Sequence, residues 1–272
     1  MKRFAITLIG LILSRISTVY LLGLILAFLA PTTKVQAETG LFLCDSGGKI
    51  GWVDVSTGAV RDIVNTGVVL TDIAVHPNGS MYAISWSNFY KIDLSTRTVE
   101  NFGAHGIPSA TAMVIDHSGT AYVSGYGNTS LYTIDLESGN GAVHHDTQYH
   151  GFGDLAFKDG HLFMTSREGS FSYDYYLVEL DLAGLGPARE IMELPMSDLW
   201  GMDTLEDGNL YGVAGTSVYL IDPDAPTLTP LSSYSGQGLL QAYGASSVPV
   251  PEPSTLSLLT LCVLSLLWRR RR

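Results

Sequence analysis

The sequence predicts an all-β fold made of five similar units. Five short segments alternate apolar with polar residues and end in aspartate, and the intervals between these aspartates are 39, 42, 46 and 41 residues. No long stretch has the 3.6-residue period of an amphipathic helix, whereas the period-two alternation of strands recurs along the chain. The five segments are residues 51–54, 90–93, 132–135, 178–181 and 219–222.

Each unit contains further strand signals in a constant order. Apolar strands at residues 72–75 and 154–157 open two of the units. The pattern predicts a strand, a glycine turn, a strand, a short link, a strand, an aspartate turn and a strand. Four antiparallel strands repeated at about 40 residues are typical of a β-propeller blade. A glycine turn followed by a hydrophobic pair occurs at residues 79–82, 119–122, 160–163 and 208–211.

The two ends of the repeat region predict how the propeller closes. Residues 41–44 match the second strand of a unit and have no first strand before them. Residues 241–245 are a candidate for that missing inner strand. We therefore expect five four-stranded blades, the first closed by both ends of the core, with no open sheet edge. The alternative is a strongly twisted β-sandwich, which the regular period disfavours.

The repeated aspartates are interpreted as turn residues. An aspartate at the start of a tight turn accepts hydrogen bonds from backbone N–H groups two residues further on. A single metal site has no need of five symmetric copies, so the repeat itself argues against a metal role. The core also contains only one cysteine, Cys44, because Cys262 lies in the tail. We expect Cys44 to be a buried strand residue without a disulfide partner.

The core is strongly acidic. The N-terminal leader and the C-terminal tail hold eight of the 15 Lys and Arg residues, which leaves seven basic against 25 acidic residues in the core. The resulting net charge of −18 repels nucleic acid and anionic lipid, so neither is expected as a partner.

Residues 1–37 are predicted to be a signal peptide with a helical apolar segment. Lys2 and Arg3 precede the apolar stretch, and Val35 and Ala37 are small residues at the two positions that a signal peptidase reads. Cleavage between Ala37 and Glu38 is the expected result. An uncleaved N-terminal anchor is the alternative, because the segment is longer than a usual signal peptide.

The C-terminal residues combine three features. A Pro251-Glu252-Pro253 motif precedes an uncharged apolar run at residues 256–268. As a helix this segment reaches about 22 Å, short of the ~30 Å hydrocarbon core, so it is a marginal membrane span. Basic residues that resist translocation follow and hold this end in the cytoplasm. They are Arg269, Arg270, Arg271 and Arg272.

This order of features resembles the PEP-CTERM protein-sorting signal of Gram-negative bacteria. The resemblance implies export by the Sec machinery, a precursor held in the inner membrane through its termini, and recognition by an exosortase-type transpeptidase. Removal of the tail and delivery to the cell surface or extracellular matrix are then expected. We accordingly predict a β-propeller domain at residues 38–248 and a sorting signal with a transmembrane helix at residues 249–272. An ordinary tail anchor is the alternative.

Two carboxylates are the candidate metal ligands. Asp72 and Asp154 occupy equivalent positions at the start of two inner strands, whereas Ala112 and Gly201 take that place in two others. Carboxylates near a propeller axis, with backbone carbonyls, could bind Ca²⁺ or a similar hard cation. A second local cluster, His144, His145, Asp146 and His150, is interpreted as a solvated loop in preference to a zinc site.

The fourth unit carries the candidate binding loop. It has the longest repeat, 46 residues, and its extra length is expected at residues 166–174 as a protruding loop, where binding residues tend to lie. The alternative is that its tyrosines only reflect strand propensity. The candidate residues are Arg167, Phe171, Tyr173 and Tyr175.

The sequence contains no catalytic motif from which to assign a catalytic residue. A Gly-x-Ser-x-Gly elbow, a phosphate loop, a cysteine pair and a dinucleotide fingerprint are all missing from it. We therefore expect a non-enzymatic surface or matrix protein that binds polysaccharide or another protein. The alternative is a propeller hydrolase or lactonase with a divalent metal ion at the channel mouth.

Overall fold

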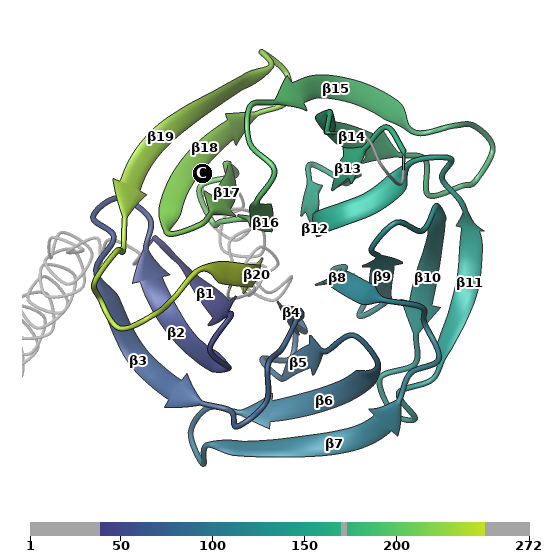
Figure 1. Cartoon of the computed structure of the whole chain (residues 1–272). Coiled ribbons are helices and arrows are strands. Elements are labelled where there is room, and N and C mark those ends of the chain that lie inside the picture. Colours follow the sequence, from purple (N-terminus) through teal and green to yellow (C-terminus); the bar gives the residue numbers. More distant parts are fainter. Residues whose placement is uncertain (1–38, 170–172, 248–272) are drawn as a thin grey trace, which may run out of the picture. The chain divides into compact units, whose positions relative to one another are not determined.

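The computed structural model describes residues 39–169 and 173–247. In these ranges the chain forms five four-stranded antiparallel sheets arranged around a central axis (Figure 1). The predicted all-β propeller of five blades is confirmed. Within the same ranges no helix has the length and apolar character needed to cross a bilayer.

Each blade runs from an inner strand at the axis to an outer strand at the rim. The first blade comprises β20 (Ala242–Ser246), β1 (Gly40–Asp45), β2 (Lys49–Asp54) and β3 (Val60–Asn65). The second comprises β4 (Asp72–Val75), β5 (Met81–Ile84), β6 (Asn88–Asp93) and β7 (Thr98–Ala104). The third comprises β8 (Ala110–Ile115), β9 (Ala121–Gly125), β10 (Ser130–Ile134) and β11 (Gly141–Asp146). The fourth comprises β12 (His150–Lys158), β13 (His161–Arg167), β14 (Tyr175–Leu180) and β15 (Arg189–Leu194). The fifth comprises β16 (Leu199–Thr204), β17 (Leu210–Ala214), β18 (Ser217–Asp222) and β19 (Thr227–Ser233).

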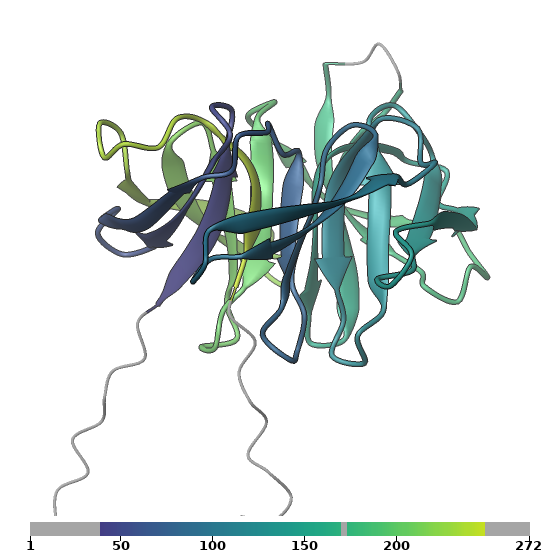
Figure 2. The same ribbon diagram turned by 90° about the horizontal axis from the view of Figure 1, so that it is seen from below.

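The first blade is closed by both ends of the described chain. Strand β20 pairs antiparallel with β1, with Leu43 opposite Ala245 and Cys44 opposite Gly244. This pairing gives β1 a partner on each side and makes β20 the inner strand of the blade. Thr39 and Ser247 consequently lie on the same face of the propeller, which we call the exit face (Figure 2). The five inner strands begin on the opposite face, which we call the mouth face.

The hydrophobic core consists of five clusters, one between each pair of neighbouring blades. The cluster between the third and fourth blades, for example, packs Leu131 against Leu155 and Leu162. Complete burial of one such side chain stabilises the fold by about 1.5–3 kcal/mol. Because every sheet buries both of its faces, the strands show long apolar runs as well as alternation.

The repeated aspartates are turn residues, as predicted. Each lies between the third strand and the outer strand of its blade and accepts a hydrogen bond from the backbone N–H two residues on. At Asp93 the Ser95 hydroxyl and then the Thr96 N–H lower the pKa of the carboxyl to about 2. Cys44 is buried in β1, also as predicted. The five turn aspartates are Asp54, Asp93, Asp135, Asp181 and Asp222.

Several predictions concern residues outside the described ranges. These are the leader with its Ala37–Glu38 cleavage site, the tail helix, and the binding-loop candidate Phe171. The sorting residues also lie outside: Pro251, Glu252, Pro253 and Arg269 to Arg272.

Candidate binding site at the channel mouth

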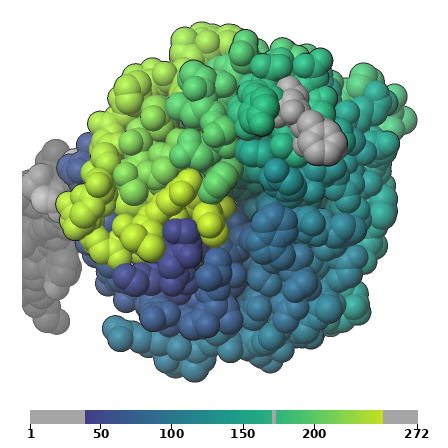
Figure 3. Space-filling view, viewed as in Figure 1, coloured from purple at the N-terminus to yellow at the C-terminus, as the bar shows by residue number. Residues whose placement is uncertain are grey.

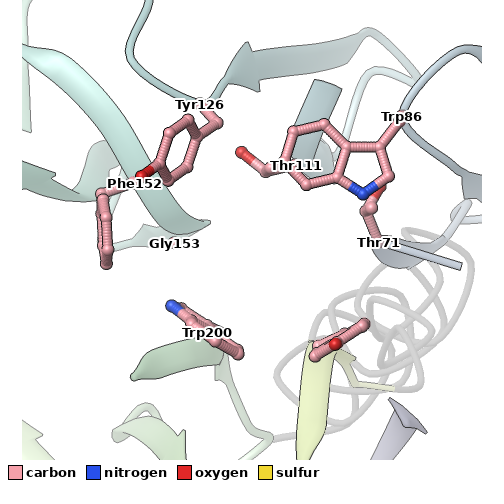
Figure 4. A pocket seen from close by; sticks show the side chains of 8 residues that line it. Thr71, Trp86, Thr111, Tyr126, Phe152, Gly153 and Trp200 are labelled. Atoms are coloured by element: carbon pink, nitrogen blue, oxygen red, sulfur yellow. The ribbon is translucent and has the colours of Figure 1, made fainter. Parts of the chain in front are cut away.

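A pocket of about 340 Å³ opens on the mouth face, where the inner strands begin. Figure 4 shows its aromatic side chains arranged around the opening. Figure 3 views this face in space-filling form, with residues of all five blades around the axis. We call this site the mouth pocket. It is lined by Thr71, Trp86, Thr111, Tyr126, Phe152, Gly153, Trp200 and Tyr243.

β-bulges place the pocket residues of four inner strands. Thr111 is the extra residue between two paired positions of β8, Trp200 is the extra residue in β16, and Tyr243 is the extra residue in β20. Phe152 and Gly153 lie in the irregular stretch of β12. A bulge sets two residues of one strand opposite one partner and re-aims a side chain. These side chains are thereby turned towards the opening.

The aromatic rings of the mouth pocket form two contacting groups. Tyr126 lies 6.0 Å from Trp86 and 5.4 Å from Phe152, measured between ring centroids. On the other side Trp200 and Tyr243 are 5.5 Å apart with their planes at 65°. Trp86 is 52% exposed and Tyr126 is 42% exposed, so ring surface is available to a ligand. Tilted and edge-on pairs at these separations hold the rings in place.

Two of the predicted binding-loop residues contact the mouth pocket. The guanidinium carbon of Arg167 lies 4.7 Å from the Tyr126 centroid and 5.0 Å from the Phe152 centroid. Tyr175 packs against Phe152 at 4.7 Å between centroids. Tyr173, by contrast, is 87% exposed. The structure therefore joins the base of this hairpin to the mouth pocket.

Asp72 and Asp154 lie side by side inside the channel, fully buried. Asp72 accepts hydrogen bonds from the N–H groups of Ile73, at 2.7 Å, and Met113, at 2.5 Å. Asp154 makes the same two kinds of contact, with the N–H groups of Leu155, at 2.7 Å, and Met202, at 2.6 Å. Each aspartate thus ties its own inner strand to the inner strand of the next blade. We call the two side chains the carboxyl pair.

The other three inner strands leave room for the carboxyl pair. Their equivalent positions hold Ala112, Gly201 and Gly244, the smallest residues available. A Cβ atom at Gly244 would lie 2.0 Å from Oδ1 of Asp72 and 2.6 Å from its Cα atom. Small residues on three strands and aspartates on two therefore fill this level of the channel.

The carboxyl pair retains a proton at neutral pH. Burial raises the pKa of Asp154 to about 8. Burial, followed by the neighbouring Asp154 carboxyl, raises the pKa of Asp72 well above its usual value. The two carboxyls are close enough for each to act on the pKa of the other. Burial therefore favours the protonated form of each of the two carboxyls.

The cation site at Asp72 and Asp154 stays a prediction. In the described ranges no group of three or more His, Cys, Asp or Glu residues is arranged to hold a metal ion. The oxygens of both carboxyls already accept backbone N–H groups. A cation here would have to share these oxygens with those donors and displace the protons that burial favours on the carboxyls.

The histidine cluster is divided between two strands. His144 and His145 lie on the outer strand β11, with ring centroids 4.8 Å apart. His150 opens the inner strand β12 and its Nδ1 contacts the Gly127 carbonyl oxygen at 2.9 Å. Burial, and then the neighbouring His144, lower the pKa of His145. The pair of rings is separate from the mouth pocket.

Most aromatic residues of the mouth pocket were not predicted from the sequence. Phe152, Trp200 and Tyr243 lie within two residues of the channel positions held by Asp154, Gly201 and Gly244. An alignment of the five units places these aromatic residues next to the channel positions, and this could have indicated that they lie near the channel. The bulges that turn them towards the opening leave no recognisable pattern in the sequence.

Comparison with solved structures confirms the fold. A chain in the crystal structure of a nidogen/laminin complex is similar, with a TM-score of 0.51 and 13% identity over 77% of this chain and 98% of that chain. Hydrazine synthase of Kuenenia stuttgartiensis has a TM-score of 0.43 and 17% identity over 73% of this chain and 66% of its own. A protein of unknown function from Bacteroides caccae has a TM-score of 0.44 and 11% identity over 75% and 77% of the two chains. At these identities the likeness to the nidogen/laminin chain shows the fold alone.

The sequence comparisons identify the C-terminal segment. No curated protein matches the sequence. Residues 249–272 match the model of the PEP-CTERM protein-sorting motif. This match confirms the resemblance drawn from the Pro-Glu-Pro motif, the apolar run and the arginine cluster. The chain is therefore a β-propeller protein with a PEP-CTERM sorting signal, which implies export, a membrane-anchored precursor and processing by an exosortase.

Proposed function

We propose that this protein is a non-enzymatic surface or matrix protein whose propeller binds polysaccharide in the mouth pocket. The observation that carries the proposal is the group of five aromatic residues around one opening. Pyranose rings present apolar C–H faces that pack on aromatic rings, while their hydroxyls bond to nearby polar groups. A concave, mainly aromatic site with a few polar atoms suits a ligand of this kind.

The size of the mouth pocket favours a sugar over a protein surface. Stable protein interfaces bury about 1,200–2,000 Å² and are usually broad and shallow. A cavity of about 340 Å³ suits one or two sugar rings of a longer chain. A protein partner remains the alternative occupant of the mouth face.

The position of the chain ends supports a role at the surface. Thr39 and Ser247 lie on the exit face, and the mouth pocket lies on the opposite face (Figure 2). A precursor or product tethered through residues after Ser247 would therefore carry the mouth pocket on the side away from its tether. Such an orientation suits a protein that binds material outside the membrane.

The hydrolase or lactonase alternative needs accessible carboxylates. Asp72 and Asp154 are both 0% exposed, and backbone N–H groups occupy their oxygens. A metal-dependent enzyme of this kind would need these side chains to turn towards the mouth pocket. The observed contacts support a structural role for the carboxyl pair.

Affinity electrophoresis through gels that contain dissolved polysaccharides tests the proposal. We expect at least one polysaccharide to retard the full-length protein, solubilised in mild detergent. Trp200→Ala removes one wall of the mouth pocket, and loss of a central aromatic contact should weaken binding at least about tenfold. Leu185→Ala, at an 89% exposed position outside the pocket, is the control and should bind normally. Retardation that is equal in both variants would show that the mouth pocket is not the binding site.

A further inference from the structure

Arg167 is a buried cation whose charge is not neutralised by any ion pair in the described ranges. Its side chain is 7% exposed and lies over the rings of Tyr126 and Phe152. The ion pairs within residues 39–169 and 173–247 involve other residues. Residues 170–172, between these ranges, are Ser, Phe and Ser and carry no charge. Buried charges in proteins are normally paired.

Unpartnered polar atoms gather around the same place. The Nε atom of Arg167, Oγ1 of Thr111 and Oγ of Ser124 are buried without hydrogen-bond partners, three of the four such side-chain atoms in the described ranges. Ser124 is paired with Ala112, the residue after Thr111. A Cβ atom on Gly151 would lie 3.0 Å from the Ser124 hydroxyl, so these groups belong to the junction of the third and fourth blades. Buried groups left in this way call for an explanation, and an unseen ligand is one.

The chemistry of these groups specifies the ligand. A guanidinium binds a planar carboxylate through two parallel N–H donors, and the two hydroxyls can bond to sugar oxygens. The neighbouring aromatic rings are the proposed platform for a sugar ring. We propose that the mouth pocket takes an acidic polysaccharide, with the carboxylate of a uronic acid residue bound by Arg167. This inference rests on the proposed polysaccharide-binding function and names the class of polymer.

The acidic charge of the domain does not prevent an acidic sugar from binding in the mouth pocket. A net charge of −18 in the core repels an anionic polymer, but the repulsion between exposed charges is screened beyond about 8 Å at physiological salt. The residues that line the mouth pocket are Thr, Trp, Tyr, Phe and Gly, none of which is negatively charged at neutral pH. Arg167 lies directly against two of these lining residues, Tyr126 and Phe152, so a carboxylate that passes the edges of their rings reaches a cation.

Calorimetric titration with matched acidic and neutral ligands tests the inference. The probes are tetragalacturonate and tetramannuronate, each compared with its methyl ester, which keeps the sugar rings and removes the charge. The protein is the full chain solubilised in mild detergent. We expect one acidic tetramer to bind at least about tenfold more tightly than its ester, as a charged hydrogen bond implies. Arg167→Gln should abolish the preference, so that the acidic tetramer and its ester bind to the variant with similar affinity. Arg189→Gln, at an exposed position paired with Glu179, is the control and should retain the preference.

The outcomes separate the inference from the proposed function. Equal affinity of the native protein for acid and ester overturns the uronate assignment. If Trp200→Ala then weakens both ligands, polysaccharide binding at the mouth pocket still stands. A tetramer of a neutral sugar that carries sulfate esters is the further probe. If it binds more tightly than either uronate, the carboxylate assignment is also overturned. Absence of binding to any saccharide, acidic or neutral, overturns both proposals. The acid–ester comparison uses the native protein, so it holds even if Arg167→Gln fails to fold.

Discussion

The carboxyl pair makes a specific prediction about the pH dependence of stability. Burial raises the pKa of Asp154 to about 8, whereas an aspartate in the unfolded chain titrates near 3.9. Between these two values the folded protein keeps a proton that the unfolded chain has released. The stability that depends on this proton is complete below about pH 4 and is lost as the pH rises towards about 8.

The size of the effect is worked out for the proton that Asp154 retains. The free energy of unfolding falls by about 1.4 kcal/mol for each pH unit, or about 2.7 kcal/mol from pH 5 to pH 7. Asp154→Asn removes this titrating group and leaves Asp72, whose pKa burial raises in both proteins. The variant should therefore lose about 2.7 kcal/mol less than the native protein over the same range. The amide cannot accept both backbone hydrogen bonds that Asp154 accepts. The variant should therefore be less stable at pH 5, by about 1–3 kcal/mol.

Urea unfolding followed by tryptophan fluorescence at pH 5, 6 and 7 measures this difference. Burial lowers the pKa of His105, which makes stability rise with pH, but that contribution is common to both proteins and cancels. Asp135→Asn is the matched control, because hydrogen bonds from Ser138 lower the pKa of this exposed turn carboxyl. The Asp135 carboxyl is ionised in both the folded and the unfolded protein from pH 5 to 7. The stability of Asp135→Asn should therefore change with pH as that of the native protein does. Parallel profiles for native protein and Asp154→Asn would refute the retained proton.

Three further predictions follow from the fold. Gly244→Ala places a Cβ atom 2.0 Å from Oδ1 of Asp72 and should destabilise the protein by about 1–3 kcal/mol or more in thermal unfolding. Gly169→Ala, whose added Cβ atom would have no atom of the described residues within 4 Å, should unfold as the native protein does. Cell fractionation should find the full chain at nearly the mass of a chain truncated after Val250, because the tail is removed, but in a different fraction; a full chain that keeps its tail, or that shares the fraction of the truncated chain, would contradict sorting through the tail. In the truncated chain Cys44 is the only cysteine, and burial raises its thiol pKa, so it should react with a thiol reagent only after unfolding, as absorbance would show.

The blade pattern was readable because it depends on local interactions. Asp93 and Asp135 repeat because each caps its own turn through hydrogen bonds to residues two and three positions away. Such contacts leave the same short pattern in every unit. The closing of the first blade by residues 241–245 was also predictable, because an unpaired strand at one end needs a partner from the other.

The binding site was only partly predictable. Arg167 and Tyr175 were singled out because they belong to the longest unit, and both contact rings of the mouth pocket. Trp200 and Tyr243 were missed because a bulge determines which way each side chain points. The role of Arg167 as an unpaired buried cation also depends on what surrounds it, which the order of residues does not show.

The sequence alone determined the repeat, the number of blades, the closing strand and the sorting signal, because each depends on nearby residues or on a linear motif. Tertiary structure alone decided which side chains share the channel. Asp72 and Asp154 are 82 positions apart in the sequence, and their burial and raised pKa values appear only when the inner strands converge at the axis. The mouth pocket likewise combines residues from all five blades, which no single unit contains.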